Sequence, residues 1–286
     1  MCSDRRARLP RLRPIATLAA ALVLLMTLRP VAAAPCSRSG EWLASLPLAP
    51  AASAADLQRI WRAAGYQRLW GVAENLSLGA ADADGGPLLR LRYPAGSYVP
   101  SATAAPRGGA GFLAPLLRHE GRGAVAACLR YQLRVPSGFR FVKGGKLPGL
   151  YGGDAPGGGK PVDGIEGFSM RLMWRSGGDL EAYAYIANAA PGTSIGRGVA
   201  RLQPGRWTTL ELELRLNRPD SSDGSLALWV DGDLKLERHD LAYRRSLEIA
   251  IDGLMFSSFF GGDDPSWASP VDQVLEFRDF QLFRPR

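Results

Sequence analysis

Short runs of alternating apolar and polar residues dominate the sequence beyond residue 64. In the clearest run, residues 209–217, four leucines alternate with polar residues. Such alternation is typical of a strand with one buried and one solvent-facing side. Further strands are predicted over 225–230, 254–260 and 274–283, with turn-forming Gly, Pro, Asn and Asp between the runs. The pattern therefore predicts an all-β antiparallel β-sandwich.

Only one short N-terminal segment has a helical pattern. Residues 56–64 are expected to form this helix, capped by Ser53 or Asp56. The preceding segment, 34–55, is rich in Ala, Pro and Ser and is predicted to be a mobile lead-in. The chain after it shows no low-complexity linker, so we expect 56–286 to form a single sandwich domain.

Two neighbouring strands carry polar rows that could form a site. In the run over 168–175, apolar residues point one way, and the other face presents Ser169, Arg171 and Arg175. In the next run, 181–186, one face presents Glu181, Tyr183 and Tyr185. The link over 176–179 has the length of a hairpin turn, so the two rows are predicted to lie side by side.

The N-terminus has the three-part layout of a secretory signal. Several arginines precede an apolar run over 15–26, and small residues follow at 31–34. The apolar run is too short to span a bilayer. We therefore expect residues 1–33 to be removed, leaving a secreted or periplasmic protein with no stable membrane insertion. A retained signal acting as a membrane anchor is the alternative.

Removal of this segment changes the meaning of the net charge. The full chain has a formal charge of +8, and residues 1–33 contain six arginines and one aspartate, so the mature chain carries +8 − 6 + 1 = +3. A nucleic-acid partner is therefore not expected, and the remaining positive charge suits an acidic glycan equally well. In an oxidising compartment, Cys36 and Cys128 either form one disulfide or remain as thiols.

Several kinds of catalytic site are excluded by the sequence. His119 and His239 lack metal-ligand spacing, so no metal site is predicted, and no cofactor is expected. The chain has no nucleophile-elbow motif, and its glycines follow neither phosphate-loop nor dinucleotide-binding spacing. What remains is a group of cations and phenols, with Lys143 and Lys146 in the Gly-rich segment 143–153.

These residue types suit β-elimination on a uronate. That reaction needs a group that neutralises the carboxylate, a base, and an acid for the departing oxygen. Arg171 can bind a carboxylate in a two-point contact. A lysine near other cations loses its proton more readily, so Lys146 can act as base or acid together with Tyr183 or Tyr185.

Structural interpretations of the same residues remain open. A Gly-rich segment such as 143–153 is more often a simple loop. The two tyrosines could serve only as packing on a half-exposed sheet, and Arg171 could form an ion pair with Glu181 across the hairpin.

The segment 143–153 together with the run 168–175 resembles polysaccharide lyase family 14, whose members cleave alginate or glucuronan. Further strings that match are Tyr93-Pro-Ala-Gly-Ser97, Gly205-Arg-Trp207, Leu216-Asn217, Val230-Asp-Gly232, Phe259-Phe-Gly-Gly262 and Trp267-Ala268. The resemblance covers roughly residues 85–283. It implies a jelly-roll sandwich of the concanavalin-like kind, with a cleft on its concave sheet, and β-elimination without a nucleophile.

The family's functional residues carry over onto matching positions of this chain. They imply catalytic roles for Lys146, Ser169, Arg171, Tyr183 and Tyr185, and we predict substrate binding by Lys143, Tyr151 and Arg175. Some family members carry a histidine just before the Ser-x-Arg strand, where this chain has Asp163 and Glu166 instead. The identity of the base is therefore open.

The sequence thus favours a polysaccharide lyase that cleaves a uronate-containing acidic polysaccharide, acting as a monomer. Two alternatives belong to other classes. One is a secreted glycan-binding protein that keeps the sandwich but lacks turnover. The other is a hydrolase, which needs paired carboxylates across the cleft, for which Asp163 and Glu166 are candidates.

Overall fold

The computed structural model describes residues 34–49, 51–79 and 86–286. The predicted signal segment, 1–33, lies outside this part of the chain. Among the described residues, no helix is long and apolar enough to cross a membrane.

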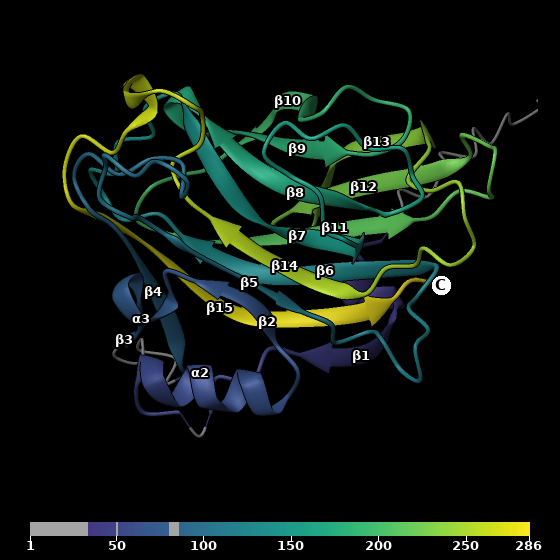
Figure 1. Cartoon of the computed structure of the whole chain (residues 1–286), viewed down its shortest axis with the longest axis horizontal. Coiled ribbons are helices and arrows are strands. Elements are labelled where there is room, and N and C mark those ends of the chain that lie inside the picture. The colour runs from purple at the N-terminus through teal and green to yellow at the C-terminus, as the bar shows by residue number, and fades with distance from the viewer. Residues whose placement is uncertain (1–33, 50, 80–85) are drawn as a thin grey trace, which may run out of the picture. The chain divides into compact units, whose positions relative to one another are not determined.

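Two antiparallel sheets stack face to face, which confirms the predicted β-sandwich (Figure 1). Within the described residues, the eight-stranded sheet has the order β13 (Asp233–Leu241), β12 (Gly224–Val230), β11 (Trp207–Arg215), β6 (Ala126–Arg134), β15 (Gln273–Arg284), β4 (Leu88–Tyr93) and β3 (Leu76–Gly79), with β1 (Glu41–Ser45) also paired to β15. The seven-stranded sheet has the order β10 (Thr193–Arg201), β9 (Asp179–Tyr185), β8 (Gly167–Arg175), β7 (Gly144–Gly153), β14 (Gly253–Ser258), β5 (Ala110–Ala114) and β2 (Gln67–Trp70).

The leucine alternation that predicted a strand over 209–217 corresponds to β11. Leu210, Leu212 and Leu214 are buried between the sheets as expected. The strand ends at Arg215, however, and Asn217 is buried instead of facing water. Its amide oxygen accepts from the backbone N–H groups of Tyr243 and Arg244, at 2.8 and 3.1 Å. A side-chain amide that satisfies buried backbone groups explains this departure from simple alternation.

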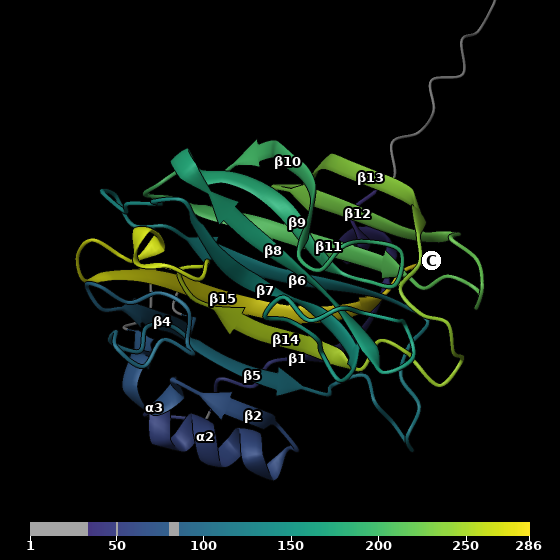
Figure 2. The same ribbon diagram turned by 45° about the horizontal axis from the view of Figure 1, so that its top comes forward.

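The predicted helix is α2 (Ala54–Ala63), which begins two residues earlier than expected because Ser53 caps it. The Ser53 hydroxyl accepts from the Asp56 backbone N–H at 3.1 Å. The buried Trp61 of this helix packs against Phe112 of β5 in a tilted arrangement, with ring centroids 4.5 Å apart, and Figure 2 shows the helix beside β2 and β5. Two single-turn helices, α1 (Cys36–Ser39) and α3 (Val72–Asn75), are too short to produce a periodic sequence signal.

The lead-in predicted to be mobile forms structure in its described part. Strand β1 pairs with the C-terminal half of β15. Leu46 and Leu48 join the core, and a disulfide links Cys36 to Cys128 of β6. Composition rich in Ala, Pro and Ser did not reveal the pairing of β1, because it depends on a strand more than 200 residues later in the chain. The disulfide is one of the two states that the sequence allowed for these cysteines.

The core between the sheets is rich in aromatic side chains. Phe256 stacks on Phe112, with centroids 4.9 Å apart, and Phe260 lies against Tyr93 and Trp174. The Tyr93 and Ser258 hydroxyls share a buried hydrogen bond of 2.7 Å. These interior contacts fix β14 and the segment after it, which pass beside β7.

Loss of the disulfide should destabilise the fold. The bridge closes a loop across a sequence separation of 92 residues, and removal of such a bridge typically costs about 2–4 kcal/mol because the unfolded chain gains freedom. We expect Cys36→Ser/Cys128→Ser to lower the urea midpoint of the oxidised protein by a corresponding amount. Treatment of the parent with a reductant should have the same effect, and equal midpoints for parent and variant would contradict this account.

Candidate active site

The Gly-rich segment is a central strand, β7, so its interpretation as a loop is wrong. Its glycines permit close approach of neighbouring groups. A Cβ atom at Gly145 would lie 2.0 Å from the Trp174 ring, and one at Gly152 would lie 2.0 Å from the Ala250 carbonyl oxygen. These glycines therefore do not mark a turn. They occupy positions on β7 where neighbouring groups lie too close for a larger residue.

A bulge at Pro148 changes which face the side chains of β7 occupy. The pairing with β8 shifts between Leu147 and Gly149, leaving Pro148 unmatched. Leu147 and Leu150 consequently both point into the core, although simple alternation would place them on opposite faces. Proline is tolerated at a bulge because no ladder donor is needed there. The bulge thereby directs Lys146 to the opposite, concave face of the sheet.

The predicted rows on β8 and β9 lie side by side, as expected. Arg171 is the cross-strand partner of Tyr183, and Ser169 is the partner of Tyr185. Lys146 pairs with Met173 on the other side of β8. Cross-strand partners share a face, so all these side chains belong to the concave surface.

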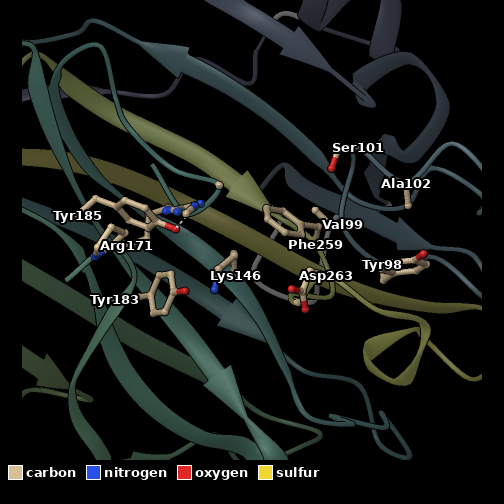
Figure 3. A pocket seen from close by; sticks show the side chains of 14 residues that line it. Tyr98, Val99, Ser101, Ala102, Lys146, Arg171, Tyr183, Tyr185, Phe259 and Asp263 are labelled. Atoms are coloured by element: carbon tan, nitrogen blue, oxygen red, sulfur yellow. Dashed lines mark hydrogen bonds between the residues drawn. The ribbon is translucent and has the colours of Figure 1, made fainter. Parts of the chain in front are cut away.

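This surface carries a pocket of about 610 Å³. Figure 3 shows Arg171, Tyr183 and Tyr185 on one side of Lys146, and Phe259, Asp263 and Tyr98 on the other. The pocket is lined by Tyr98, Val99, Ser101, Ala102, Lys146, Gly158, Gly159, Arg171, Tyr183, Tyr185, Pro191, Phe259, Gly262 and Asp263.

The Lys146 side chain is only 7% exposed. Its Nζ lies 2.9 Å from the Met173 sulfur and 3.3 Å from the centre of the Tyr183 ring. Its backbone is fixed from both sides, because its N–H donates to the Phe259 carbonyl and its carbonyl accepts from the Ser258 hydroxyl, each at 2.8 Å. The amine therefore sits at a defined position in an environment with few groups to solvate its charge.

Burial, together with the nearby charges of Arg171 and Arg175, lowers the pKa of Lys146 to about 6, and the charge of Glu181 opposes this shift. Both burial and like charge disfavour the protonated amine. At neutral pH the amine is therefore mostly uncharged and able to accept a proton.

Arg171 is buried to 3% exposure without a carboxylate partner among the described residues. Its Nη1 donates to the Ser257 hydroxyl at 3.3 Å, and its buried Nε has no hydrogen-bond partner there. Burial lowers its pKa, but a guanidinium starts high enough to stay charged. A buried cation with an unused donor is suited to bind an anion.

The alternative in which Arg171 pairs with Glu181 is not found. Glu181 pairs with Arg175, with Nη2 and Oε1 2.7 Å apart, and it accepts from the Ser194 hydroxyl at 2.9 Å. This ion pair occupies Arg175, which does not line the pocket. The negative charge of Glu181 is thus neutralised by Arg175, and Arg171 takes no part in this ion pair.

The two tyrosines form a phenol pair next to these cations, with ring centroids 5.8 Å apart. Burial, followed by the neighbouring Tyr185, raises the pKa of Tyr183, so its phenol stays protonated at neutral pH. Tyr185 accepts from the Gly159 backbone N–H at 2.9 Å. The site therefore combines a neutral amine, a guanidinium and two phenols.

Other predicted site residues lie outside the pocket lining. Ser169 donates to the Pro156 carbonyl at 2.6 Å, which anchors the loop that also contacts Tyr185. Lys143 contacts the Ser266 hydroxyl on the exposed rim. Tyr151 shares the concave face but is buried against Leu113 and Ala155. Ser169 and Tyr151 are cross-strand partners that do not line the pocket, and their predicted roles stay predictions.

The pocket residues on the other side of Lys146 from Arg171, among them Tyr98 and Asp263, were not assigned roles from the sequence. The strings 93–97 and 259–262 were noticed only as matches, and Tyr98 and Asp263 adjoin them. Strand parity could not place these residues, because they lie on irregular connections. Asp163 and Glu166, considered as possible acids, do not line the pocket, and Asp163 accepts from Ile165 in its own loop.

One group of metal-ligand residue types gathers in the described chain, namely Cys36, Cys128 and Glu211. The two sulfurs are joined in the disulfide, and the Glu211 carboxylate accepts from the Ser37 backbone N–H at 3.0 Å. A disulfide offers no thiolate, so this group is structural.

Comparison with known proteins identifies the family. The family model described as Polysaccharide lyase 14 matches residues 81–280. The chain belongs to polysaccharide lyase family 14. No curated protein sequence matches the chain. The fold and the family membership together make this protein a polysaccharide lyase.

Solved structures of alginate and glucuronan lyases are similar to this lyase. The marine PL-14 alginate lyase from Aplysia kurodai has 28% identity and a TM-score of 0.70, covering 86% of this chain and 99% of its own. An alginate lyase from Chlorella virus has 20% identity and a TM-score of 0.67, covering 85% and 100%. The endo-β-1,4-glucuronan lyase from Trichoderma reesei has 12% identity and a TM-score of 0.51, covering 77% and 91%, so its similarity shows the fold alone.

Burial of Lys146 should cost the lyase stability. An apolar side chain of similar length needs no desolvation, so Lys146→Met should raise the free energy of unfolding at pH 7 by about 0.5–2 kcal/mol, as is common when a functional strain is removed. The folded amine releases its proton near pH 6, whereas the unfolded one holds it to about 10.4. The parent therefore gains stability as pH rises between these values, and the advantage of the variant shrinks.

Chemical denaturation at several pH values measures this difference. Lys143→Met is the matched control, because Lys143 is exposed and should change stability little. A destabilised Lys146→Met variant, or an advantage that grows with pH, would show that the buried amine is not the source of the strain.

Proposed function

We propose that this lyase cleaves a uronate-containing acidic polysaccharide of the alginate or glucuronan type by β-elimination. The observation that carries the proposal is a buried amine with a lowered pKa next to a buried guanidinium without an acidic partner, in one open pocket. The alginate lyase from Aplysia kurodai, at 28% identity, supports this substrate class.

The carboxylate of the uronate is bound by Arg171. Its guanidinium offers donors in a planar fork that matches a carboxylate. Neutralising the carboxylate stabilises the negative charge that develops when the proton on the adjacent carbon, C5, is removed. The position of Arg171 beside both tyrosine rings, 5.6 and 5.9 Å from their centres, brings this carbon near the phenols and the amine.

Lys146 accepts the C5 proton, because its amine is mostly neutral at neutral pH. Tyr183 or Tyr185 donates a proton to the glycosidic oxygen on C4. The C5–H and C4–O bonds break, a double bond forms between C4 and C5, and the departing chain leaves with a hydroxyl. A positioned acid and base typically contribute about 10²- to 10⁴-fold each, so charge stabilisation by Arg171 supplies a further part of the rate.

A hydrolytic mechanism is less suited to the pocket. Inverting and retaining glycosidases both require two carboxyl groups flanking the bond. Asp263 is the single carboxylate among the residues that line the pocket. The cationic and phenolic groups around Lys146 instead match the needs of elimination.

We also propose that the enzyme is secreted or periplasmic and acts as a monomer. The signal-like pattern of residues 1–33 supports export. The disulfide between Cys36 and Cys128 is of a kind that persists in oxidising compartments.

The decisive assay follows ultraviolet absorbance of the unsaturated product. The mature protein should give this signal on at least one of alginate, polymannuronate, polyguluronate and glucuronan. Arg171→Gln should lower kcat/KM by about 10²- to 10³-fold, the usual effect of losing one charge-stabilising group. Arg201→Gln is the matched control, because Arg201 pairs with Asp179 on the surface and should keep parental activity.

Folded protein that gives no unsaturated product on any of these polymers would refute β-elimination on them. Retained binding without product would instead indicate a glycan-binding protein. Saturated fragments would indicate hydrolysis.

A further inference from the structure

The two walls of the pocket carry different charges. Arg171 is the charged cation of the lining and lies on the wall formed by β8 and β9, whereas the Lys146 amine on the floor is mostly neutral at neutral pH. The opposite wall, from Tyr98 and Ser101 to Phe259 and Asp263, contains no cation among its lining residues and contains the pocket's carboxylate. Figure 3 shows the Asp263 carboxylate across the groove from Arg171.

Asp263 is held at this place by fixed neighbours. The Gly261 N–H donates to the Gly144 carbonyl at 3.0 Å. Gly262 adopts φ +113°, and a Cβ there would lie 2.2 Å from the Trp267 ring, so only glycine fits. Asp264 then caps the short 3₁₀ helix η2 (Pro265–Trp267) by accepting from the Ser266 N–H at 2.7 Å. The carboxylate is therefore presented to the groove by a structured turn.

The two adjacent aspartates have different tasks. The carboxylate of Asp264 is used by its own turn. Asp263 is exposed and forms no hydrogen bond or ion pair with any described residue, although it lines the pocket. Removing its charge should therefore not disturb the fold, which leaves an action on the ligand as its role.

A polyuronate chain would bring carboxylates to both walls. In a 1→4 diequatorial polymer such as glucuronan or polymannuronate, successive rings are turned over, so their carboxylates point alternately to opposite sides. When Arg171 holds the carboxylate of the cleaved uronate, the neighbouring carboxylate is directed to the wall of Asp263. Two like charges in contact repel each other, whereas a sugar hydroxyl would donate a charge-assisted hydrogen bond to Asp263.

We propose that Asp263 is a specificity-determining residue that disfavours a second carboxylate, so that the preferred glycan has a sugar without a carboxylate next to the cleaved uronate. This inference rests on the proposed function and goes beyond it, because every sugar of alginate and glucuronan carries a carboxylate, whereas the preferred glycan would place a neutral sugar beside the cleaved uronate. Asp263 acts on the substrate, because it is exposed in the pocket lining and forms no ion pair with any described residue.

The test compares Asp263→Asn with the parent on intact glucuronan and on the same polymer after partial reduction of its carboxylates to alcohols. Partial reduction creates uronates with neutral neighbours on an unchanged backbone. The parent should show a higher kcat/KM per remaining uronate on the reduced polymer. Asp263→Asn should raise kcat/KM on intact glucuronan by about 3- to 10-fold, as expected for one exposed charge contact, and this gain should shrink at high salt.

Asp264→Asn is the matched control, because it removes the same charge one residue away and outside the pocket lining. It should keep the parental preference between the two polymers. Equal or lower activity of Asp263→Asn on intact glucuronan, or an equal gain in Asp264→Asn, would overturn the inference. Absence of unsaturated product from every polymer would instead refute the proposed function, so the two failures are distinguishable.

Discussion

The burial of the Lys146 amine beside Arg171 is the constraint on which the site depends. An ammonium group placed there loses most of its hydration and faces a second cation, so the neutral amine is favoured. The same desolvation strengthens the attraction of Arg171 for a carboxylate. A single arrangement of two side chains thus keeps the Lys146 amine mostly neutral and leaves the Arg171 guanidinium with a donor available for an anion.

The fold holds this unfavourable arrangement in place through the aromatic core behind it. Ser258 links the buried Tyr93 hydroxyl to the backbone carbonyl of Lys146, and the Phe259 carbonyl binds its N–H. The bulge at Pro148 directs the amine to the concave face. The Glu181–Arg175 pair keeps a carboxylate close to the site without neutralising Arg171. Stability supplied elsewhere in the sandwich therefore permits a strained site.

Strand parity was enough to predict the part of the site that lies on regular strands. The rows of Arg171 and Tyr183 could be placed side by side because period-two alternation and a short hairpin link determine cross-strand neighbours. Lys146 was singled out by its residue type and its cationic neighbours, and the family resemblance then supported that choice. Its position on a central strand was not predictable from composition, since glycines selected for close packing resemble those of a loop.

Features that depend on irregular backbone or distant partners escaped prediction. The bulge at Pro148 interrupts the alternation of β7 without any sign in the sequence pattern. The burial of both Leu147 and Leu150 in the core could therefore not be predicted. The hydrogen bond that the Ser169 hydroxyl donates to the Pro156 carbonyl could not be predicted either, because the sequence did not define the course of that loop. The position of Asp263 in the groove was not predicted for the same reason, because it depends on a turn that packs against Trp267.

The most direct test of this account is an NMR titration of the lysine side chains, with the Lys146 signal assigned by comparison with Lys146→Met. The account predicts a midpoint near pH 6, because burial and the charges of Arg171 and Arg175 disfavour the ammonium form. A midpoint near 10, the ordinary value for an exposed lysine, would contradict it, because the amine would then be charged at neutral pH and unable to accept the proton.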